Sequence, residues 1–437
     1  MFKTLRNAFK IKEIRMKLLF TFAMLVVIRL GSQLPVPGVD REYFARWFAA
    51  QSGDTFNFFD AFTGGSFLNM SVFALNITPY ITSSIIMQLM TIAIPKLEEM
   101  QKEGEDGRKK IASITRYVTV GLALIESTAM AIGFGRSGLL ETFNALNVIT
   151  VIAALTAGSA VLMWIGERIT ENGVGNGISI VLIINIISRI PQDITGLFNQ
   201  FVKDKPIALA VLSGAIILAI IFLMVVLVII LNDGERRIPV QYAKKMQGRK
   251  MVGGQTTNIP LKVNTAGVIP IIFASSIMEF PIIICQLCGV NASGFWAEIM
   301  KGLSSSNWVK IKTPQYSIGL VVYILLVIFF AYFYTSITFN PIEIADSMKK
   351  NGGFVPGIRP GKPTSDYLTK ILNYIIFIGA CGLTVVGVLP FVFNGLFNAS
   401  VSFGGTSIII IVSVILETIK QVESQMLVRN YRGFLND

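Results

Sequence analysis

Few residues in this chain are of the types that carry out chemistry, and their spacing fits none of the common reactions. The chain has no histidine and only 3 cysteines. Cys285 and Cys288 have redox-motif spacing, but they end an apolar stretch outside any strand–helix–strand context, so we interpret them as packing residues. Such a composition leaves almost no ligands for zinc or haem. We therefore expect no metal site and no cofactor.

The glycine-rich segments do not match nucleotide-binding motifs either. The glycines of residues 173–177 stand at alternate positions, unlike the dinucleotide fingerprint, and they join two apolar stretches. Gly361-Lys362 is followed by Pro363, which has no hydroxyl group for a metal ion. If the chain moves a substrate, the energy must come from a partner, a gradient or the substrate's own partitioning.

Ionisable side chains inside apolar stretches are the remaining chemical candidates. Glu126 lies in the middle of one such stretch and is the best candidate for a proton relay, whereas Arg29, Glu279 and Glu417 lie near the ends of others. One carboxylate without a histidine or a second acid makes an incomplete relay. An ion-coupled secondary transporter for a small solute is therefore the second of two interpretations.

The elements that must position these residues are long apolar helices. Hydrophobic residues make up 53% of the 437 residues, and the mean hydropathy is +0.64. A helix needs about 20 apolar residues to cross a bilayer core. Charge-sparse stretches near that length cover residues 17–34, 72–94, 111–133, 146–165, 177–190, 207–231, 264–285, 316–339, 371–393 and 405–419. We predict an all-α polytopic membrane protein with ten transmembrane helices.

The basic residues are distributed unequally between the two sides of such a protein. With ten spans, 28 of the 38 lysines and arginines fall on the side of the termini and 9 on the other side. Because cytoplasmic loops carry the excess of positive charge, both termini are expected in the cytoplasm. The net charge of +12 would then lie mainly on the cytoplasmic face. It could attract anionic lipids, nucleic acid or an acidic protein, or it could reflect topology alone.

Ten spans divide into two sets of five at the outer loop between spans 5 and 6. The halves would be residues 1–200 and 201–437, and an odd number of spans in each gives them opposite orientations. We infer an inverted repeat from this parity, without residue-level similarity between the halves. Inverted halves typically enclose a path at their interface near the middle of the bilayer.

Three loops are long enough to carry function. The outer loop at 39–71 contains an apolar, glycine-rich piece at 56–67, which either lies on the membrane surface or, as we favour, folds back among the helices. The cytoplasmic loops at 232–263 and 340–370 combine positive charge with glycine and proline. That composition predicts stiff, protruding loops rather than packed domains.

The second apolar stretch has an isoleucine row. Ile77, Ile81 and Ile85 recur at every fourth position and share one helix face, whereas Asn76 and Gln88 are among the polar residues on other faces. On periodicity alone, the row would face lipid and the polar residues would make helix–helix contacts.

This stretch belongs to a series of segments that resembles the SecY family, whose members form the central subunit of the bacterial protein translocation channel. One is Pro356-Gly357-Ile358-Arg359-Pro360-Gly361. The segments together are 31–38, 73–89, 102–110, 164–179, 267–276, 354–361 and 404–407. They are non-repetitive, they follow the family's order, and they span nearly the whole chain.

The resemblance implies a clamshell of two five-helix halves around an hourglass pore. Its constriction ring would consist of Ile77, Ile81, Ile178, Leu182, Ile272 and Ile410. A plug at about 57–69 would seal the pore at rest with residues that include Phe58, Phe59, Phe62, Gly64 and Gly65. A lateral gate toward lipid would include Thr82, Ile85, Gln88, Ser275 and Phe280. The aliphatic ring offers no hydrogen bonds to a sliding polypeptide and resists water and ions.

The resemblance also implies partners for the basic loops. Arg249, Lys250 and Arg359 correspond to family residues that dock the ribosome, with its polyanionic RNA, or the motor ATPase SecA. SecE and SecG are the implied partner subunits. The function would be a passive channel in the bacterial cytoplasmic membrane. It would export unfolded polypeptides that carry a signal sequence and release transmembrane segments sideways into lipid.

Overall fold

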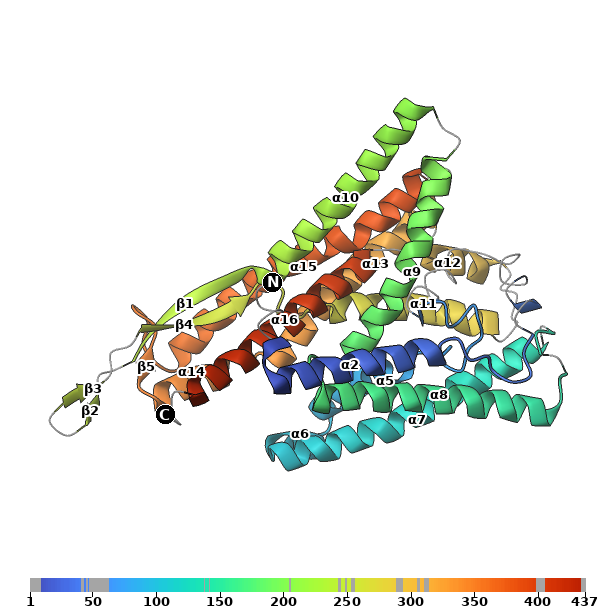
Figure 1. Cartoon of the computed structure of the whole chain (residues 1–437). Coiled ribbons are helices and arrows are strands. Elements are labelled where there is room, and N and C mark those ends of the chain that lie inside the picture. The colour runs from blue at the N-terminus through green and yellow to red at the C-terminus, as the bar shows by residue number, and fades with distance from the viewer. Residues whose placement is uncertain are drawn as a thin grey trace.

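Helices dominate the part of the chain that the computed structural model describes, namely residues 9–40, 43–44, 46, 63–136, 138–140, 142–203, 206–242, 245–247, 250–252, 256–287, 294–304, 307–309, 314–397 and 405–433. The long helices are α2 (Lys12–Gly31), α5 (Thr78–Ala93), α7 (Glu105–Arg136), α8 (Ala145–Asn172), α9 (Gly177–Phe201), α10 (Ile207–Asp233), α11 (Ile269–Leu287), α13 (Ser317–Thr338), α15 (Lys362–Phe397) and α16 (Gly405–Gly433). The short ones are α6 (Pro95–Lys102), α12 (Phe295–Leu303), α14 (Pro341–Lys350) and the 3-10 helix η2 (Pro314–Tyr316). Figure 1 shows α2, α7 and α8 side by side in one group, and α10, α15 and α16 in a second group inclined to it.

Each of the ten predicted spans falls on one of the long helices. Among the described residues, 6 helices are long and apolar enough to cross a membrane, namely α7 to α10, α13 and α15, and the bent pair α5 and α6 would make a seventh. Helices α2, α11 and α16 cover the other predicted ranges without passing that test of length and composition. The prediction of a helical polytopic protein therefore agrees with the described helices.

The second span differs from its predicted bounds. Helix α5 begins at Thr78, later than the predicted residue 72, because residues 72–77 form turns in which Asn76 has a positive φ of 53°. Pro79 occupies the first turn of α5 and Pro95 that of α6, where the missing N–H of proline costs no hydrogen bond. The two helices meet at an angle of 106°. The proline positions, more than hydrophobicity, set where this span starts and stops.

The prediction for the two cytoplasmic loops was wrong. Residues 232–263 contain the antiparallel strands β1 (Glu235–Tyr242) and β4 (Thr256–Lys262), and the short pair β2 (Lys245–Gln247) and β3 (Lys250–Val252). Strand β5 (Gly353–Phe354) of the other loop pairs with the end of β1. Inward-facing apolar residues of β1 and β4 pack with α14 and α15 in a core that contains Ile238, Val240, Leu261, Met348, Val355, Leu368, Ile371 and Ile375. Ile238 and Val240 stand two positions apart around Pro239, between Arg237 and Gln241, and this period of two was the strand signal in the sequence.

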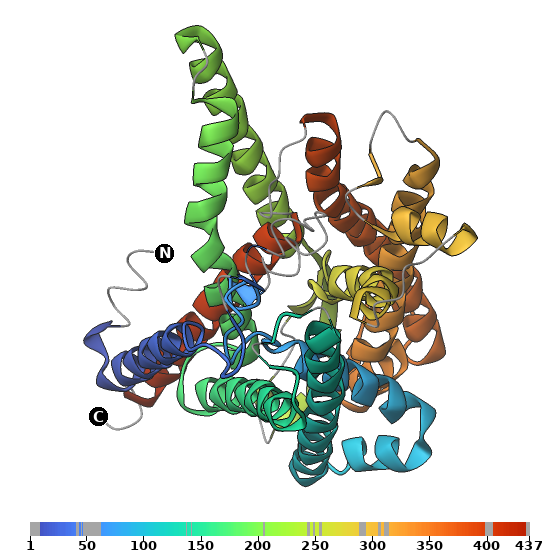
Figure 2. The same cartoon turned by 90° about the vertical axis from the view of Figure 1, so that its right-hand side faces the viewer.

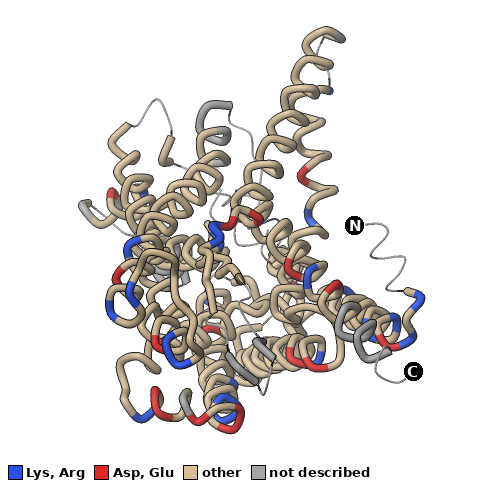
Figure 3. The backbone as a smooth tube through the Cα atoms, turned by 90° about the vertical axis from the view of Figure 1, so that its left-hand side faces the viewer, with Lys and Arg blue, Asp and Glu red and all other residues tan. Residues whose placement is uncertain are grey.

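This small packed unit marks one end of the molecule. Figure 1 places β1, β4, β5 and α14 at one end and α12 at the other. Figure 3 looks at the strand end and shows charged residues gathered around that face, while the projecting hairpin of α9 and α10 carries few of them. Charged residues are thus more frequent on this face than on the α9–α10 hairpin.

Candidate functional site

The six residues expected at the constriction lie in one hydrophobic cluster. Ile77, Leu182 and Ile410 are buried, with 0%, 8% and 2% of their surface exposed, and Ile81, Ile178 and Ile272 are half-buried against them. Four of them come from the first half: Ile81 lies on α5, Ile77 directly before it, and Ile178 and Leu182 on α9. The other two come from the second half, with Ile272 on α11 and Ile410 on α16. Figure 2 shows the yellow-to-orange helices to the right of the middle and the blue-to-teal helices below and to the left of them. The cluster thus joins elements from both halves.

Local structure sets the position of these side chains. The Asn176 side chain caps α9 by accepting hydrogen bonds from the N–H groups of Ile178 and Ser179, at 3.1 and 3.4 Å. The cap fixes the start of the helix, and Ile178 and Leu182 then follow one turn apart on one face. Ile77 is the residue that precedes the first turn of α5.

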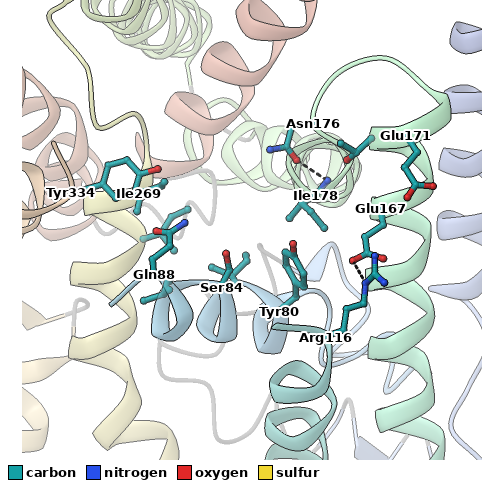
Figure 4. A pocket seen from close by; sticks show the side chains of 14 residues that line it. Tyr80, Ser84, Gln88, Arg116, Glu167, Glu171, Asn176, Ile178, Ile269 and Tyr334 are labelled. Carbon is teal, nitrogen blue, oxygen red and sulfur yellow. Dashed lines mark hydrogen bonds and ion pairs between the residues drawn. The ribbon is translucent and has the colours of Figure 1, made fainter. Parts of the chain in front are cut away.

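A cavity of about 480 Å³ adjoins the cluster (Figure 4). Its lining combines apolar residues with charged and polar ones: Tyr80, Ile81, Ser84, Ile85, Gln88, Arg116, Glu167, Thr170, Glu171, Asn176, Ile178, Ile269, Ile272 and Tyr334. Ile81, Ile178 and Ile272 belong to both the cavity and the hydrophobic cluster. The cavity therefore ends on part of the expected ring, and its lining comes from both halves.

The charged residues of the cavity gather on one side of it. Arg116 of α7 donates from Nε to Glu167 Oε1 of α8 at 2.7 Å, and Figure 4 shows this pair next to Tyr80. Glu171, one turn further along α8, pairs with Arg168 at 2.9 Å. Gln88, Ile269 and Tyr334 lie on the other side in the same view. The cavity thus has a charged side and a side without charge.

The expected plug is described only from Thr63 onward, so Phe58, Phe59 and Phe62 lie outside the described residues. Residues 63–67 are buried among the helices, as re-entry predicts. The Gly64 carbonyl accepts hydrogen bonds from Arg29 Nη1 of α2 at 3.4 Å and from Ser188 Oγ of α9 at 3.3 Å. Gly64 and Gly65 both have positive φ angles, of 67° and 84°. This stem, residues 63–70, is therefore fastened to two helices.

The expected gate residues lie on α5 and α11. Thr82 and Ile85 are half-buried and Gln88 is exposed, and Ile85 and Gln88 line the cavity. The Ser275 hydroxyl is buried and has no hydrogen-bond partner among the described residues, and the side chain of Phe280 lies outside them.

The isoleucine row and the polar residues of α5 face different neighbours. Ile77 and Ile81 belong to the hydrophobic cluster, and Ile81 and Ile85 line the cavity, so the row does not simply face lipid. On another face, the Ser83 hydroxyl meets that of Thr119 on α7. Polar helix–helix contacts were thus predicted correctly. The lipid-facing row expected from periodicity alone was wrong, whereas the resemblance had placed Ile77 and Ile81 at the constriction and Ile85 at the gate.

Of the expected docking residues, Arg359 is described fully. It is exposed in the turn after β5, and its carbonyl accepts a hydrogen bond from Thr364 Oγ1 at 2.8 Å. Arg249 lies outside the described residues, and of Lys250 only the backbone, in β3, is described. The turn of Arg359 and the strand pair β1–β4 share one packed unit through β5.

Sequence reasoning missed a buried amide pair beside the ring. Asn185 of α9 donates from Nδ2 to Asn76 Oδ1 at 2.9 Å, and the Asn76 carbonyl accepts from Ser159 Oγ at 3.3 Å. In the second half, Asn264 donates to Asn232, which donates to Ser413 of α16, at 2.9 and 2.7 Å. Asn185 and Ser413 stand at equal distances from the first residues of α9 and α16.

A short internal repeat was the signal for this symmetry. Two six-residue segments have similar residue types at nearly every position, namely Gly177-Ile178-Ser179-Ile180-Val181-Leu182 and Gly405-Thr406-Ser407-Ile408-Ile409-Ile410. The repeat places two expected ring residues, Leu182 and Ile410, at the same position of α9 and α16.

The ionisable residues considered for a proton relay are not brought together. Arg29 contacts the plug stem, Glu417 is exposed, and the side chain of Glu279 lies outside the described residues. Glu126 is half-buried in α7. Within the described ranges no group of histidine, cysteine and carboxylate side chains could hold a metal ion, and Cys288 and the side chain of Cys285 lie outside those ranges.

Comparison with known proteins gives concordant matches. The SecY family model matches residues 71–419. The chain is 44% identical over 443 residues to the protein translocase subunit SecY of Streptomyces galbus, covering 98% of each chain, and 42% identical to that of Halalkalibacterium halodurans, covering 100% of each. A solved protein-conducting channel aligns with a TM-score of 0.61 at 17% identity, over 94% of this chain and 92% of that one. Sec61 in a canine ribosome–channel complex aligns with a TM-score of 0.59 at 16% identity, with the same coverage, so both structures indicate a shared fold.

Proposed function

The chain belongs to the SecY family and is a protein-conducting channel, and from this premise we propose that it passes unfolded secretory polypeptides through the six-residue ring and releases transmembrane segments sideways into lipid. The resemblance read from the motifs is confirmed, as are the helical membrane fold and the non-enzymatic function. The second interpretation, a small-solute secondary transporter, is wrong because the family is that of a protein translocase.

One observation carries the proposed path. A cavity with a polar side ends on Ile81, Ile178 and Ile272, and these three share a cluster with Ile77, Leu182 and Ile410. A polypeptide backbone needs hydrogen bonds, and a path that offered fixed ones would hold it in place. An aliphatic ring offers none, so an extended chain can slide, while a dry constriction opposes ions. We propose residues 1–200 and 201–437 as the two halves that meet at this ring.

Sideways release requires the halves to part between α5 and α11. The cavity lining includes Ile85 and Gln88 of α5 and Ile269 of α11, which supports a seam there. We propose Thr82, Ile85, Gln88, Ser275 and Phe280 as residues of this gate and the segment around 57–69 as the plug. An apolar segment would gain a few tenths of a kcal/mol per central leucine or isoleucine on entering lipid and lose about 3 per central charge.

The cytoplasmic unit of β1, β4, β5 and α14 is the proposed docking site for a driving partner. Arg359 is exposed there, and Arg249 and Lys250 belong to the same loop as β1. We propose the ribosome and SecA as alternative partners and SecE and SecG as companion subunits. A structural neighbour is part of a ribosome–channel complex, which supports the first of these. Anionic lipids of a bacterial cytoplasmic membrane would contact the same basic face.

Reconstitution tests this function. The chain with its companion subunits is placed in lipid vesicles with SecA, ATP and a labelled secretory precursor. We expect the precursor to become protected from external protease in an ATP-dependent manner. Uptake of small solutes without protection of the precursor would overturn the proposal.

A further inference from the structure

The cavity beside the ring differs in charge from the surface around it. The chain has a net charge of +12, and the proposed cytoplasmic side holds most of its basic residues. Within the cavity lining, however, the charged residues are two carboxylates, Glu167 and Glu171, and one guanidinium, Arg116. The lining thus holds one more carboxylate than cations, on a basic face, and Glu171 is paired at 2.9 Å with Arg168, which lies outside the lining.

Glu167 is the more enclosed of the two carboxylates. Its side chain is 21% exposed, compared with 54% for Glu171. Its partner Arg116 contacts Glu167 through Nε at 2.7 Å and is 45% exposed. The Arg116 side chain can therefore turn into solvent and leave its place to another cation. Tyr80 lies beside the pair, and an aromatic ring can also receive a cation on its face.

The rest of the lining offers aliphatic surface to an apolar segment. Beyond the charged residues, the apolar part of the lining consists of five isoleucines, and residues with polar groups accompany them. The isoleucines are Ile81, Ile85, Ile178, Ile269 and Ile272, and the polar group consists of Tyr80, Ser84, Gln88, Thr170, Asn176 and Tyr334. Ile85 belongs to α5 and Ile269 to α11, the two helices of the proposed gate. A ligand that fits this arrangement has a positive charge at one end and an aliphatic run after it. Signal sequences have a positively charged start followed by 7–15 apolar residues.

We propose that Glu167 is a specificity-determining residue, whose carboxylate receives the positive charge that precedes the apolar run of an entering segment, in exchange for Arg116. The released Arg116 turns to solvent, which its exposure allows. The apolar run then lies along the isoleucine wall, in register with the gate. This proposal rests on the proposed function, because it concerns how one class of translocated chain is chosen.

The test compares two variants that break the same ion pair. Vesicles with the channel, SecA and ATP translocate two precursors. One carries two lysines before its apolar run, and the other carries two glutamines at the same positions. The charge preference is the rate of the lysine precursor divided by the rate of the glutamine precursor. Glu167→Gln should lower this preference by about fivefold, the size of a partly exposed ion pair. Arg116→Gln should keep or raise it, because the carboxylate is then free for the substrate.

A purely structural clasp predicts a different outcome, in which both variants change the two rates alike and leave the preference unaltered. The exchanged pair Arg116→Glu with Glu167→Arg keeps an ion pair but moves the carboxylate, so it should reduce the preference while retaining translocation. Glu167→Asp should restore most of it. Glu103→Gln removes a carboxylate that pairs with Lys110 at 3.6 Å outside the cavity lining, and it should behave as wild type.

The outcomes separate this proposal from the proposed function. If Glu167→Gln translocates and keeps the wild-type charge preference, the specificity role is overturned and the channel function stands. If the wild-type channel protects neither precursor, the channel function itself fails. Equal loss of preference in Glu103→Gln and Glu167→Gln would assign the effect to the basic face in general and would also overturn the role of Glu167.

Discussion

In the proposed ring, single side chains decide whether the constriction is dry. The ring residues are all aliphatic, so water in the constriction would find no hydrogen-bonding partner among them. Each polar atom placed there would hold water and lower the cost of an open, hydrated state. The ring should therefore be sensitive to polarity at positions where the surrounding helices tolerate it.

Replacing Ile410 with asparagine tests this sensitivity. Ile410 is 2% exposed in the apolar cluster, and the amide of asparagine should favour hydration of the ring. We expect the ion conductance of vesicles that contain Ile410→Asn to rise several-fold over wild type. Ile415 lies on the same helix with 40% of its surface exposed, so Ile415→Asn is the matched control and should not leak. Equal conductance in the two variants would place Ile410 outside the ring.

The plug stem offers a test that depends on steric fit. A Cβ atom added at Gly64 would lie 2.7 Å from the Asn185 carbonyl oxygen and 2.8 Å from its Cα, whereas one added at Gly65 would meet nothing closer than 3.8 Å. Both positions have positive φ, so alanine at either costs about 1–2 kcal/mol of backbone strain. Gly64→Ala should in addition displace the stem from α9 and raise resting ion leak, while Gly65→Ala should leak much less. A similar leak in both would assign the effect to backbone strain alone.

Arg359 is the residue on which the proposed docking depends most. Its exposed guanidinium lies in a turn stiffened by proline and glycine, so charge reversal should remove a partner contact without disturbing the core. We expect Arg359→Glu to reduce SecA-driven export at least tenfold, as for a truncated charge pair at an interface. Lys362→Glu reverses another exposed charge nearby and should change export little. Normal export by Arg359→Glu would remove this residue from the docking site.

Individual residues could be assigned from the sequence only where a motif carried them. The ring residues lie in segments similar to the family, and the structure gathers all of them in one cluster. Asn76 and Asn185 could not be paired from the sequence, because their contact joins residues 109 positions apart. Their partnership depends on how α9 packs beside the start of α5, which periodicity does not reveal.

At the level of elements, hydrophobicity located the helices better than their ends. Predicted and observed ranges overlap for all ten spans, but α7, α15 and α16 extend well beyond the apolar stretches into polar segments. Helical hydrogen bonding continues wherever the chain permits it, so the edge of the membrane does not terminate a helix. The strands were missed because glycine and proline near them were taken as the dominant signal, although Ile238 and Val240 already alternate.

The proposed gate predicts that α5 and α11 must separate. The test uses a channel whose three native cysteines have been replaced by serine. Gln88→Cys and Ile269→Cys are then introduced at two positions that line the cavity, and a cleavable thiol crosslinker joins them across it. We expect this staple to stop membrane release of an apolar segment, and reduction of the linker to restore it. Export that continues at the full rate through the stapled channel would argue against a gate between these helices.

The matched control is a staple within one half. The hydroxyl groups of Ser83 on α5 and Thr119 on α7 are in direct contact, so cysteines at these positions should form a disulfide. Because α5 and α7 belong to the same half, this link should leave release intact. If it blocks release as strongly as the staple across the cavity, rigidity of α5 alone explains both effects.

At the level of the whole molecule, the proposed inverted halves would explain why matched positions supply the proposed ring. Leu182 and Ile410 stand at the same place in α9 and α16, and Ile77 and Ile272 stand near the starts of α5 and α11. The number of spans predicted this arrangement by parity alone. The internal repeat at the starts of α9 and α16 is too short to be noticed before the structure shows where both segments lie.

The central claim is that a translocating polypeptide passes through the six-residue ring, and site-specific crosslinking of a stalled substrate measures this most directly. A photoreactive amino acid replaces Ile81, Ile178 or Ile410 in turn, and a precursor with a folded carboxyl-terminal domain is arrested during export. We predict strong crosslinks from these positions to the arrested chain, and none from Leu218 or Phe222, which are 70% and 71% exposed on α10. Crosslinks to the substrate from α10 and not from the ring positions would contradict the account.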